Sequence, residues 1–258
     1  MFQSPGSAAW RKVRIRDRAE GSSVRFRDRI VAVKIAGERL GRRLMKREMR
    51  AMNIKVRKAT ADDAQLIAWA IVESSRSGKP IGLFDLIFQT DDDASLFEAL
   101  AKLTTTETKS YCHFSNFLVA ETGGEAAAVL CAYEPRIMNR ELFSRALEEV
   151  GIDAGYESRI AEYLLCVPEN DRQTWALDFI AQRPGHESFE VVKELVQKSL
   201  LTARLKGYRK VQANAEIGAL PVQMLYEKLG FGFVDEKRSS YYKELFGRPG
   251  IMRYSLTL

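Results

Sequence analysis

The chain has 258 residues, of which 46% are apolar, so it is long and apolar enough to bury a core. Its longest apolar runs, such as residues 126–133, fall far short of the ~20 residues that cross a bilayer, and its N-terminus lacks the apolar region of a secretory signal, which argues against a membrane or exported protein. The net charge of +6 originates in residues 1–50, with 15 Lys or Arg against 5 Asp or Glu; the remainder has 25 against 29 and gives no sign of nucleic-acid binding.

Residues 1–51 form a basic segment in which arginine recurs almost every second or third residue, without a helical or strand period. This composition is typical of a solvated tail, of upstream sequence translated from a misplaced start, of a targeting peptide, or of an arm for nucleic acid or membrane surfaces. Because Met52-Asn-Ile-Lys-Val-Arg opens the first clear strand, the tail and misplaced-start interpretations are favoured. We therefore expect the folded domain to span residues 52–258.

Hydrophobic periodicity gives the elements of this domain in chain order. Alternating apolar residues predict strands, apolar residues three or four apart predict helices, and Gly, Pro and Asp mark their ends. The predicted elements are a strand from residue 54, helices through 66–71 and 91–103, a hairpin of strands 115–121 and 126–133, a helical insertion over 137–164, a strand 175–181, a helix 188–206, a strand 210–217, a helix 221–229, and strands 231–234 and 252–256. This order predicts an α/β (α+β) fold, a mixed central sheet flanked by helices with the insertion before the fourth strand.

Two stretches of this pattern carry a resemblance to a known family. The run Pro221-Val-Gln-Met-Leu-Tyr-Glu-Lys-Leu-Gly-Phe231, which follows a strand, a long helix and a strand, resembles the C-terminal half of the GNAT superfamily of acyl-CoA N-acyltransferases. Residues 56–64 resemble its first strand and capped helix, and residues 117–124, 235–238 and 246–250 look like an uncharacterised bacterial subgroup. The resemblance implies acetyl-CoA as co-substrate and an amine as acceptor.

The same resemblance implies where acetyl-CoA binds. In the family its pantetheine arm pairs with the backbone of the fourth strand, which here corresponds to Ile180, Ala181 and Gln182. A backbone edge constrains side chains only loosely. The three residues are therefore equally consistent with an ordinary strand.

The predicted pyrophosphate loop departs from the family pattern. The family places Arg and Gly at the start of the long helix, where backbone N–H groups approach phosphate oxygens. Counting back from Gly207 instead assigns Glu187, Ser188, Phe189 and Glu190 to this loop. A second register, residues 182–185, recovers a glutamine and a glycine but shortens the strand.

Two residues are candidates for catalysis. Tyr226 occupies the position of the tyrosine that, in many members of the family, protonates the departing thiolate; alternatively, it is a buried residue that holds its helix to the sheet. Asp178 lies two residues before Ile180, so period-two alternation predicts both on one face, beside the expected cofactor. The resemblance implies that a carboxylate on this strand deprotonates the amine. Alternatively, Asp178 is an ordinary aspartate that faces solvent or forms an ion pair.

The remaining polar candidates are weaker. His113 and His186 have no Ser or Cys partner at a recognisable spacing, although a protonated His186 would add a cation to the loop. Tyr111, Phe114 and Phe117 are candidates for either an acceptor pocket or core. Three widely spaced cysteines in apolar surroundings predict reduced thiols in a cytoplasmic protein and no metal site.

Three functions follow from these residues. The first is transfer of an acetyl group from acetyl-CoA to a small-molecule or protein amine. The second, favoured by the acids at Glu187 and Glu190, is a GNAT-fold ligand-binding or interaction module without activity. The third, a nucleic-acid binder, depends on the basic segment alone and is disfavoured; a homodimer stays open.

Overall fold

The computed structural model describes residues 53–258 except 91, 169–170 and 172. Within them the chain forms a seven-stranded sheet with the order β1-β2-β3-β4-β5-β7-β6. Strands β4 and β5 pair in parallel and the other neighbours pair antiparallel, which confirms the expected mixed sheet. The strands are β1 (Lys55–Lys58), β2 (Phe117–Thr122), β3 (Glu125–Tyr133), β4 (Trp175–Gln182), β5 (Lys210–Glu216), β6 (Gly232–Arg238) and β7 (Gly250–Thr257).

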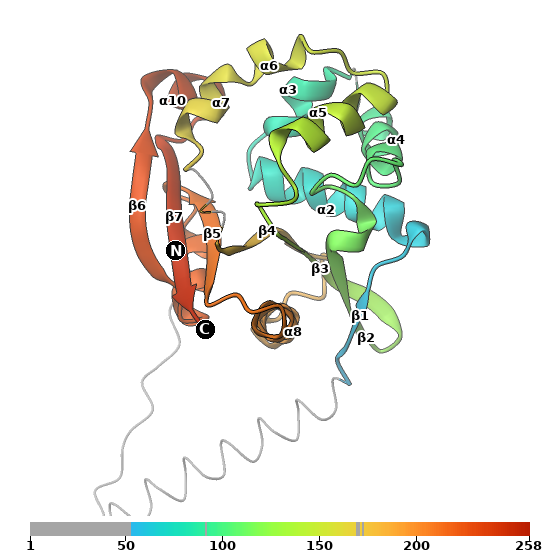
Figure 1. The fold of residues 1–258 in the computed structure, drawn as a ribbon, viewed down its shortest axis with the longest axis vertical. Helices are drawn as coiled ribbons and strands as arrows, with labels where there is room; N and C mark the ends of the chain where they lie inside the picture. The colour runs from blue at the N-terminus through green and yellow to red at the C-terminus, as the bar shows by residue number, and fades with distance from the viewer. Residues whose placement is uncertain (1–52, 91, 169–170, 172) are drawn as a thin grey trace, which may run out of the picture. The chain divides into compact units, whose positions relative to one another are not determined.

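Helices cover both faces of the sheet, as Figure 1 shows. One face packs against α2 (Ala64–Arg76), α3 (Leu83–Phe88), α4 (Asp93–Leu103), α5 (Arg140–Glu149) and α6 (Tyr156–Arg159), and the opposite face packs against α8 (Phe189–Leu205) and α9 (Leu220–Lys228). A smaller apolar cluster joins α7 (Ala161–Cys166) to α10 (Ser240–Phe246). The predicted helical insertion is confirmed as α5–α7, between β3 and β4.

Two short helices were absent from the sequence prediction. In α3 the Asp85 carboxylate accepts the Gly82 N–H at 2.8 Å, and in α10 the Ser239 hydroxyl accepts the Tyr242 N–H at 3.3 Å. Six or seven residues are too few to show a helical period, so local capping and tertiary packing decide these segments. Strand β6 also extends beyond the predicted residues 231–234, because its charged residues up to Arg238 pair with β7.

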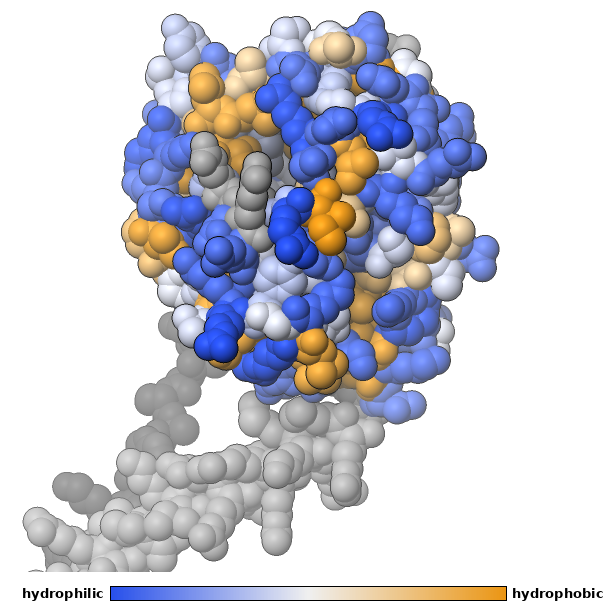
Figure 2. Space-filling model, viewed as in Figure 1, coloured by the Kyte–Doolittle hydropathy of each residue, from blue (hydrophilic) through white to orange (hydrophobic). Residues whose placement is uncertain are grey.

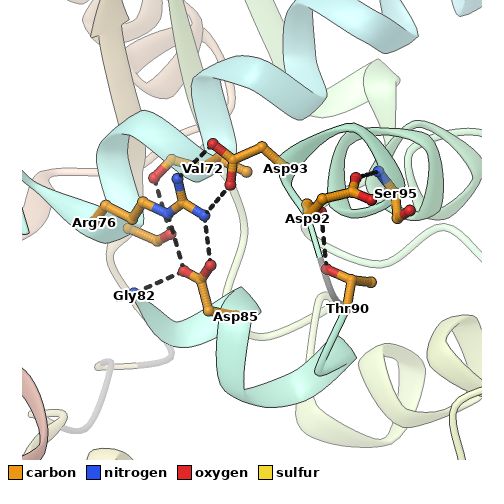
Figure 3. Close-up of polar contacts among 9 residues, drawn as sticks. Val72, Arg76, Gly82, Asp85, Thr90, Asp92, Asp93 and Ser95 are labelled. Carbon is orange, nitrogen blue, oxygen red and sulfur yellow. Dashed lines mark hydrogen bonds and ion pairs between the residues drawn. The ribbon is translucent and has the colours of Figure 1, made fainter. Parts of the chain in front are cut away.

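An ion cluster fixes the C-terminal end of α2 (Figure 3). The Arg76 guanidinium donates to Asp85 on α3 and to Asp93 on α4, with N···O distances of 2.6 Å to each. Asp92 caps α4 by accepting the Ser95 N–H at 2.8 Å. The cluster holds three helices together beside the last turn of α2, which lines the cavity described below.

The surface is mixed in character. On the face shown in Figure 2, apolar side chains form separate patches between hydrophilic ones. None of the described helices is long and apolar enough to cross a membrane.

The boundary after residue 51 stays a prediction, because the basic segment lies outside the described residues. We expect deletion of residues 1–50 to leave the melting midpoint nearly unchanged, since that segment has no apolar period with which to pack on a sheet. Thermal unfolding of the full chain and of residues 51–258, followed by circular dichroism, measures this. A midpoint about ten degrees lower, which corresponds to several kcal/mol for a domain of this size, would instead show that the segment packs on the domain.

Candidate active site

Strands β4 and β5 separate part-way along their length. Their register pairs Trp175 with Val211 and continues only to Leu177 and Ala213. Beyond that point β4 runs on to Gln182 and β5 to Glu216, while β4 stays paired with β3. Among the strands that the structure describes, none lies beside this edge of β4 over residues 178–182.

A bulge in β4 marks the point of separation. Phe179 has a positive φ of 45°, and its N–H donates to the Asp178 carboxylate at 2.8 Å. A positive φ is strained for a side chain of this size and costs of order 1–3 kcal/mol, which packing must offset. The Phe179 ring packs against Phe84 and Phe117, with ring centroids 5.8 and 6.3 Å away.

The bulge overturns one expectation. Asp178 and Ile180 were predicted on one face of the sheet. In the strand register Asp178 instead lies opposite Cys131, which belongs to the core with α2, whereas Ile180 packs with α8 on the other face. The extra residue shifts the alternation by one. Asp178 and Ile180 nevertheless line the same cavity, because the cavity passes through the opening between the strands.

The free edge of β4 presents backbone amides. The Arg183 N–H donates to Ala127 on β3 at 2.8 Å. Since N–H directions alternate along a strand, Ala181 also faces β3, whereas the N–H groups of Ile180 and Gln182 face the opening. Of the three backbone positions in the prediction, two are thus oriented toward an incoming extended chain.

A cavity of about 400 Å³ occupies this opening. Strand β4 contributes Asp178, strand β5 contributes Glu216, and α9 contributes Tyr226; α2 and the insertion supply further walls. Aromatic side chains are prominent, with Tyr111, Tyr133, Phe143, Tyr156, Tyr163 and Tyr242 lining it. The structure thus brings the two predicted catalytic residues to one cavity.

The pKa values of Asp178 and Tyr226 are both raised. Burial raises the pKa of Asp178 to about 6, against a smaller opposing effect of the hydrogen bond from the Phe179 N–H. Burial, and to a lesser degree the charge of Asp178, raise the pKa of Tyr226 above its ordinary value. Near neutral pH the site therefore holds a carboxylate of increased basicity beside a phenol that keeps its proton.

A groove of about 760 Å³ continues from this cavity toward the start of α8. We call it the donor groove; it shares Ile180, Val222 and Leu225 with the cavity. Its other lining residues are Gln182, Glu187, Ser188, Phe189, Pro221, Met224, Glu227 and Lys228. The structure thus brings the backbone edge of β4 and the predicted phosphate loop to one surface.

The loop between β4 and α8 is held by its own side chains. The Gln182 side chain donates to the Ser188 carbonyl at 2.9 Å. The Glu187 carboxylate accepts the Gly185 N–H at 2.9 Å, and Glu190, in the first turn of α8, pairs with Lys193 at 3.0 Å. Two carboxylates therefore stand where the resemblance expects a phosphate-binding arginine and glycine.

The arrangement of strands and helices has counterparts among solved structures. No family model and no curated protein matches the chain. Among solved structures, an N-acetyltransferase from Staphylococcus aureus Mu50 superposes with a TM-score of 0.56 at 16% identity, over 79% of this chain and all of that one. A second structure, described as an acetyltransferase, has a TM-score of 0.53 at 18% identity, over 77% of this chain and 97% of that one.

This chain has the GNAT fold. Its seven strands and the long helix after β4 occur in the order that the sequence predicted. At 16–18% identity the likeness establishes the fold and does not extend to acceptor or activity.

The other sequence candidates are placed as follows within this fold. Tyr111 lines the cavity, whereas Phe117 is buried and stacked on Phe179. His186 is 3.3 Å from the Thr122 hydroxyl and 3.7 Å from Glu125, so it faces the β2–β3 hairpin. The three cysteines are buried and unpaired, and the described residues contain no group of side chains able to bind a metal.

A buried ion cluster beside the cavity escaped the sequence analysis. Lys79 pairs with Glu216, and the Tyr242 hydroxyl donates to the same Glu216 oxygen at 2.7 Å. Burial lowers the pKa of Lys79, with the attraction of Glu216 opposing it. A Glu at the end of a predicted strand was the only available signal, since its partners lie 137 and 26 residues away in the chain.

Proposed function

We propose that this protein is an acyltransferase that transfers the acetyl group of acetyl-CoA to an amine. One observation carries the proposal: Asp178 and Tyr226 line a single cavity at the point where β4 and β5 separate. A base and an acid of different pKa, placed on either side of a substrate-sized space, are the arrangement that proton transfer in both directions requires. The GNAT fold agrees with this assignment.

In this proposal Asp178 prepares the acceptor. An amine attacks a thioester only through its free electron pair, so its proton must leave. A carboxylate with a pKa of about 6 is ionised at neutral pH and more basic than an ordinary aspartate. Asp178 removes the proton directly or through a water molecule.

Tyr226 then serves the leaving group. When the nitrogen has bonded to the carbonyl carbon, the carbon–sulfur bond breaks and the sulfur takes up a proton. The Tyr226 phenol supplies it, and its raised pKa keeps it protonated until that step. The phenolate then takes up the proton that the nitrogen loses as the amide forms. The N–H groups of Ile180 and Gln182 hold the extended donor in line by pairing with its amides, as an added strand does.

The acceptor is a small-molecule or protein amine. The cavity is lined by Glu73 and Asp178 against Arg140, and the Glu216 carboxylate is already paired with Lys79, so charge by itself does not select the acceptor. The expected cytoplasmic location and the homodimer remain predictions from sequence.

Calorimetric titration of the full chain with acetyl-CoA and with CoA tests the proposal, followed by mass spectrometry of a mixed amine panel incubated with acetyl-CoA. We expect binding of both ligands and acetylation of at least one amine. Absence of binding would reject the proposed function.

A second function is a GNAT-fold module that binds a ligand without catalysis. The acids Glu187 and Glu190 at the start of α8 favour it, because they oppose a pyrophosphate. Binding of CoA without acetylation of any amine in the panel would favour this alternative.

The pH dependence of activity tests the role of Asp178. Because the carboxylate must be ionised to accept a proton, and its pKa is about 6, we expect kcat/KM to fall below pH 6 by about tenfold for each pH unit. Asp178→Asn should lower turnover and remove this limb. The amine acceptor is itself protonated and less reactive at low pH. The measurement therefore compares the pH profile of kcat/KM for the unaltered protein with that for Asp178→Asn. Identical profiles would show that Asp178 is not the base.

A further inference from the structure

The outer end of the donor groove does not resemble a phosphate site. Its charged lining residues are Glu187, Glu227 and Lys228, two carboxylates against one ammonium. Glu190, in the first turn of α8, adds a third carboxylate, which is paired with Lys193. A dianion placed here meets repulsion at the position where the fold ordinarily offers attraction.

One N–H donor of the loop is already satisfied within the loop. The Gly185 N–H, which a phosphate oxygen would otherwise accept, is taken by the Glu187 carboxylate at 2.9 Å. Acidic groups in the first turn also compensate the partial positive charge of a helix N-terminus, and α8 has Glu190 there. Glu187 thus takes one N–H donor that a ligand phosphate would use, and Glu190 lowers the positive potential at the start of α8.

The one cation of the groove lining is also engaged. The Lys228 ammonium lies 3.8 Å above the centre of the Phe189 ring. A cation held over an aromatic face at this distance is already stabilised and would have to leave the ring to reach a phosphate. At the next helical positions Val191 and Val192 are fully buried, where small residues would let a ligand approach the backbone.

The inner part of the groove has the opposite character. Ile180, Phe189, Pro221, Val222 and Leu225 give it an apolar wall, and the N–H groups of Ile180 and Gln182 face it. This combination fits a narrow chain that carries amides and ends in a thioester. The pantetheine arm is such a chain, and the nucleotide and its phosphates are not.

We propose that this protein recognises its acyl donor as a pantetheine thioester and that the nucleotide end of CoA contributes no affinity. The inference rests on the proposed function and specifies its donor. The donor is then held by the β4 edge and the apolar wall, and its outer end projects past Glu187 and Glu190 into solvent. CoA, 4′-phosphopantetheine and pantetheine share this arm and differ in the groups at its outer end. They therefore bind with similar affinity.

Calorimetric titration of the full chain with pantetheine, 4′-phosphopantetheine and CoA tests this without an acceptor. We expect the three dissociation constants to agree within about threefold, because the shared arm makes the productive contacts. Affinity for CoA more than about tenfold above that for pantetheine would overturn the inference and leave the proposed function standing. Tighter binding of phosphopantetheine than of both others would overturn it by revealing a phosphate site. If none of the three binds, the proposed function itself fails.

A charge-removing variant sharpens the test. In Glu187→Gln, Glu190→Gln we expect CoA to bind about threefold tighter, since each carboxylate near a phosphate repels it, while the affinity for pantetheine stays the same. Glu194→Gln, on the same helix but outside the groove lining, is the matched control and should change neither affinity. Equal gains for CoA and pantetheine would contradict the inference, because the effect would then not depend on phosphate.

Discussion

Tyr226→Phe is expected to lower turnover by about 10²-fold or more while affinity for acetyl-CoA stays similar, because a positioned general acid supplies about 10²–10⁴-fold of the rate. The substitution removes one hydroxyl and keeps the ring, which packs 5.5 Å from Phe231 and 5.6 Å from Tyr254. Steady-state kinetics with an amine identified in the panel, together with calorimetry, separate the two effects. The expected signature is a loss in kcat without a matching rise in the dissociation constant.

Tyr254→Phe is the matched control for this prediction. Tyr254 belongs to the same buried aromatic cluster but does not line the cavity. It should leave turnover nearly unchanged, so a general disturbance of packing is distinguished from loss of an acid. If Tyr226→Phe also retains full turnover, Tyr226 is a packing residue and water protonates the thiolate.

The double change Glu187→Arg, Glu190→Gly is expected to tighten binding of acetyl-CoA by roughly ten- to a hundredfold. It replaces two repulsive carboxylates with a cation and an open backbone at a helix N-terminus, and charge-assisted hydrogen bonds contribute about 1.5–3 kcal/mol. Calorimetry of the variant and of the unaltered chain measures the change.

Pantetheine provides the internal control for the second prediction. Because it lacks phosphate, its affinity should not follow that of acetyl-CoA. Unaltered or weaker binding of acetyl-CoA by the variant would mean that these positions do not face the pyrophosphate. The alternative register through Gln182 and Gly185 would then describe the site better.

The start of α8 shows which features of the candidate site could be predicted from the local sequence. Counting from Gly207 assigned Glu187, Ser188, Phe189 and Glu190 to the phosphate loop, and periodicity predicted the helix over 188–206; in the structure α8 begins at Phe189, so Phe189 and Glu190 lie in its first turn. The helix bounds are predicted within one residue because helix length and a glycine with positive φ at its end, here 85°, are local properties. What Glu187 contacts was not predictable, because its bond to Gly185 depends on the path of the loop.

The β4 bulge shows where such reasoning fails. Period-two alternation assigned Asp178 and Ile180 to one face, and a regular strand would have obeyed it. Phe179 adopts its left-handed conformation because aromatic residues from α3 and β2 enclose its ring, and no pattern within residues 175–182 records them. The same holds for the Lys79–Glu216 pair, which joins residues 137 positions apart.

The sequence by itself determined the order of strands and helices, the insertion before β4, and the resemblance in residues 221–231, because periodicity, capping residues and turn glycines act over a few residues. The tertiary structure alone decided that β4 and β5 part after Leu177 and Ala213, and that Asp178 and Tyr226 line one cavity there. It also raised the pKa of Asp178 to about 6. Burial and contacts between distant segments set these properties, and both exist only once the chain has folded.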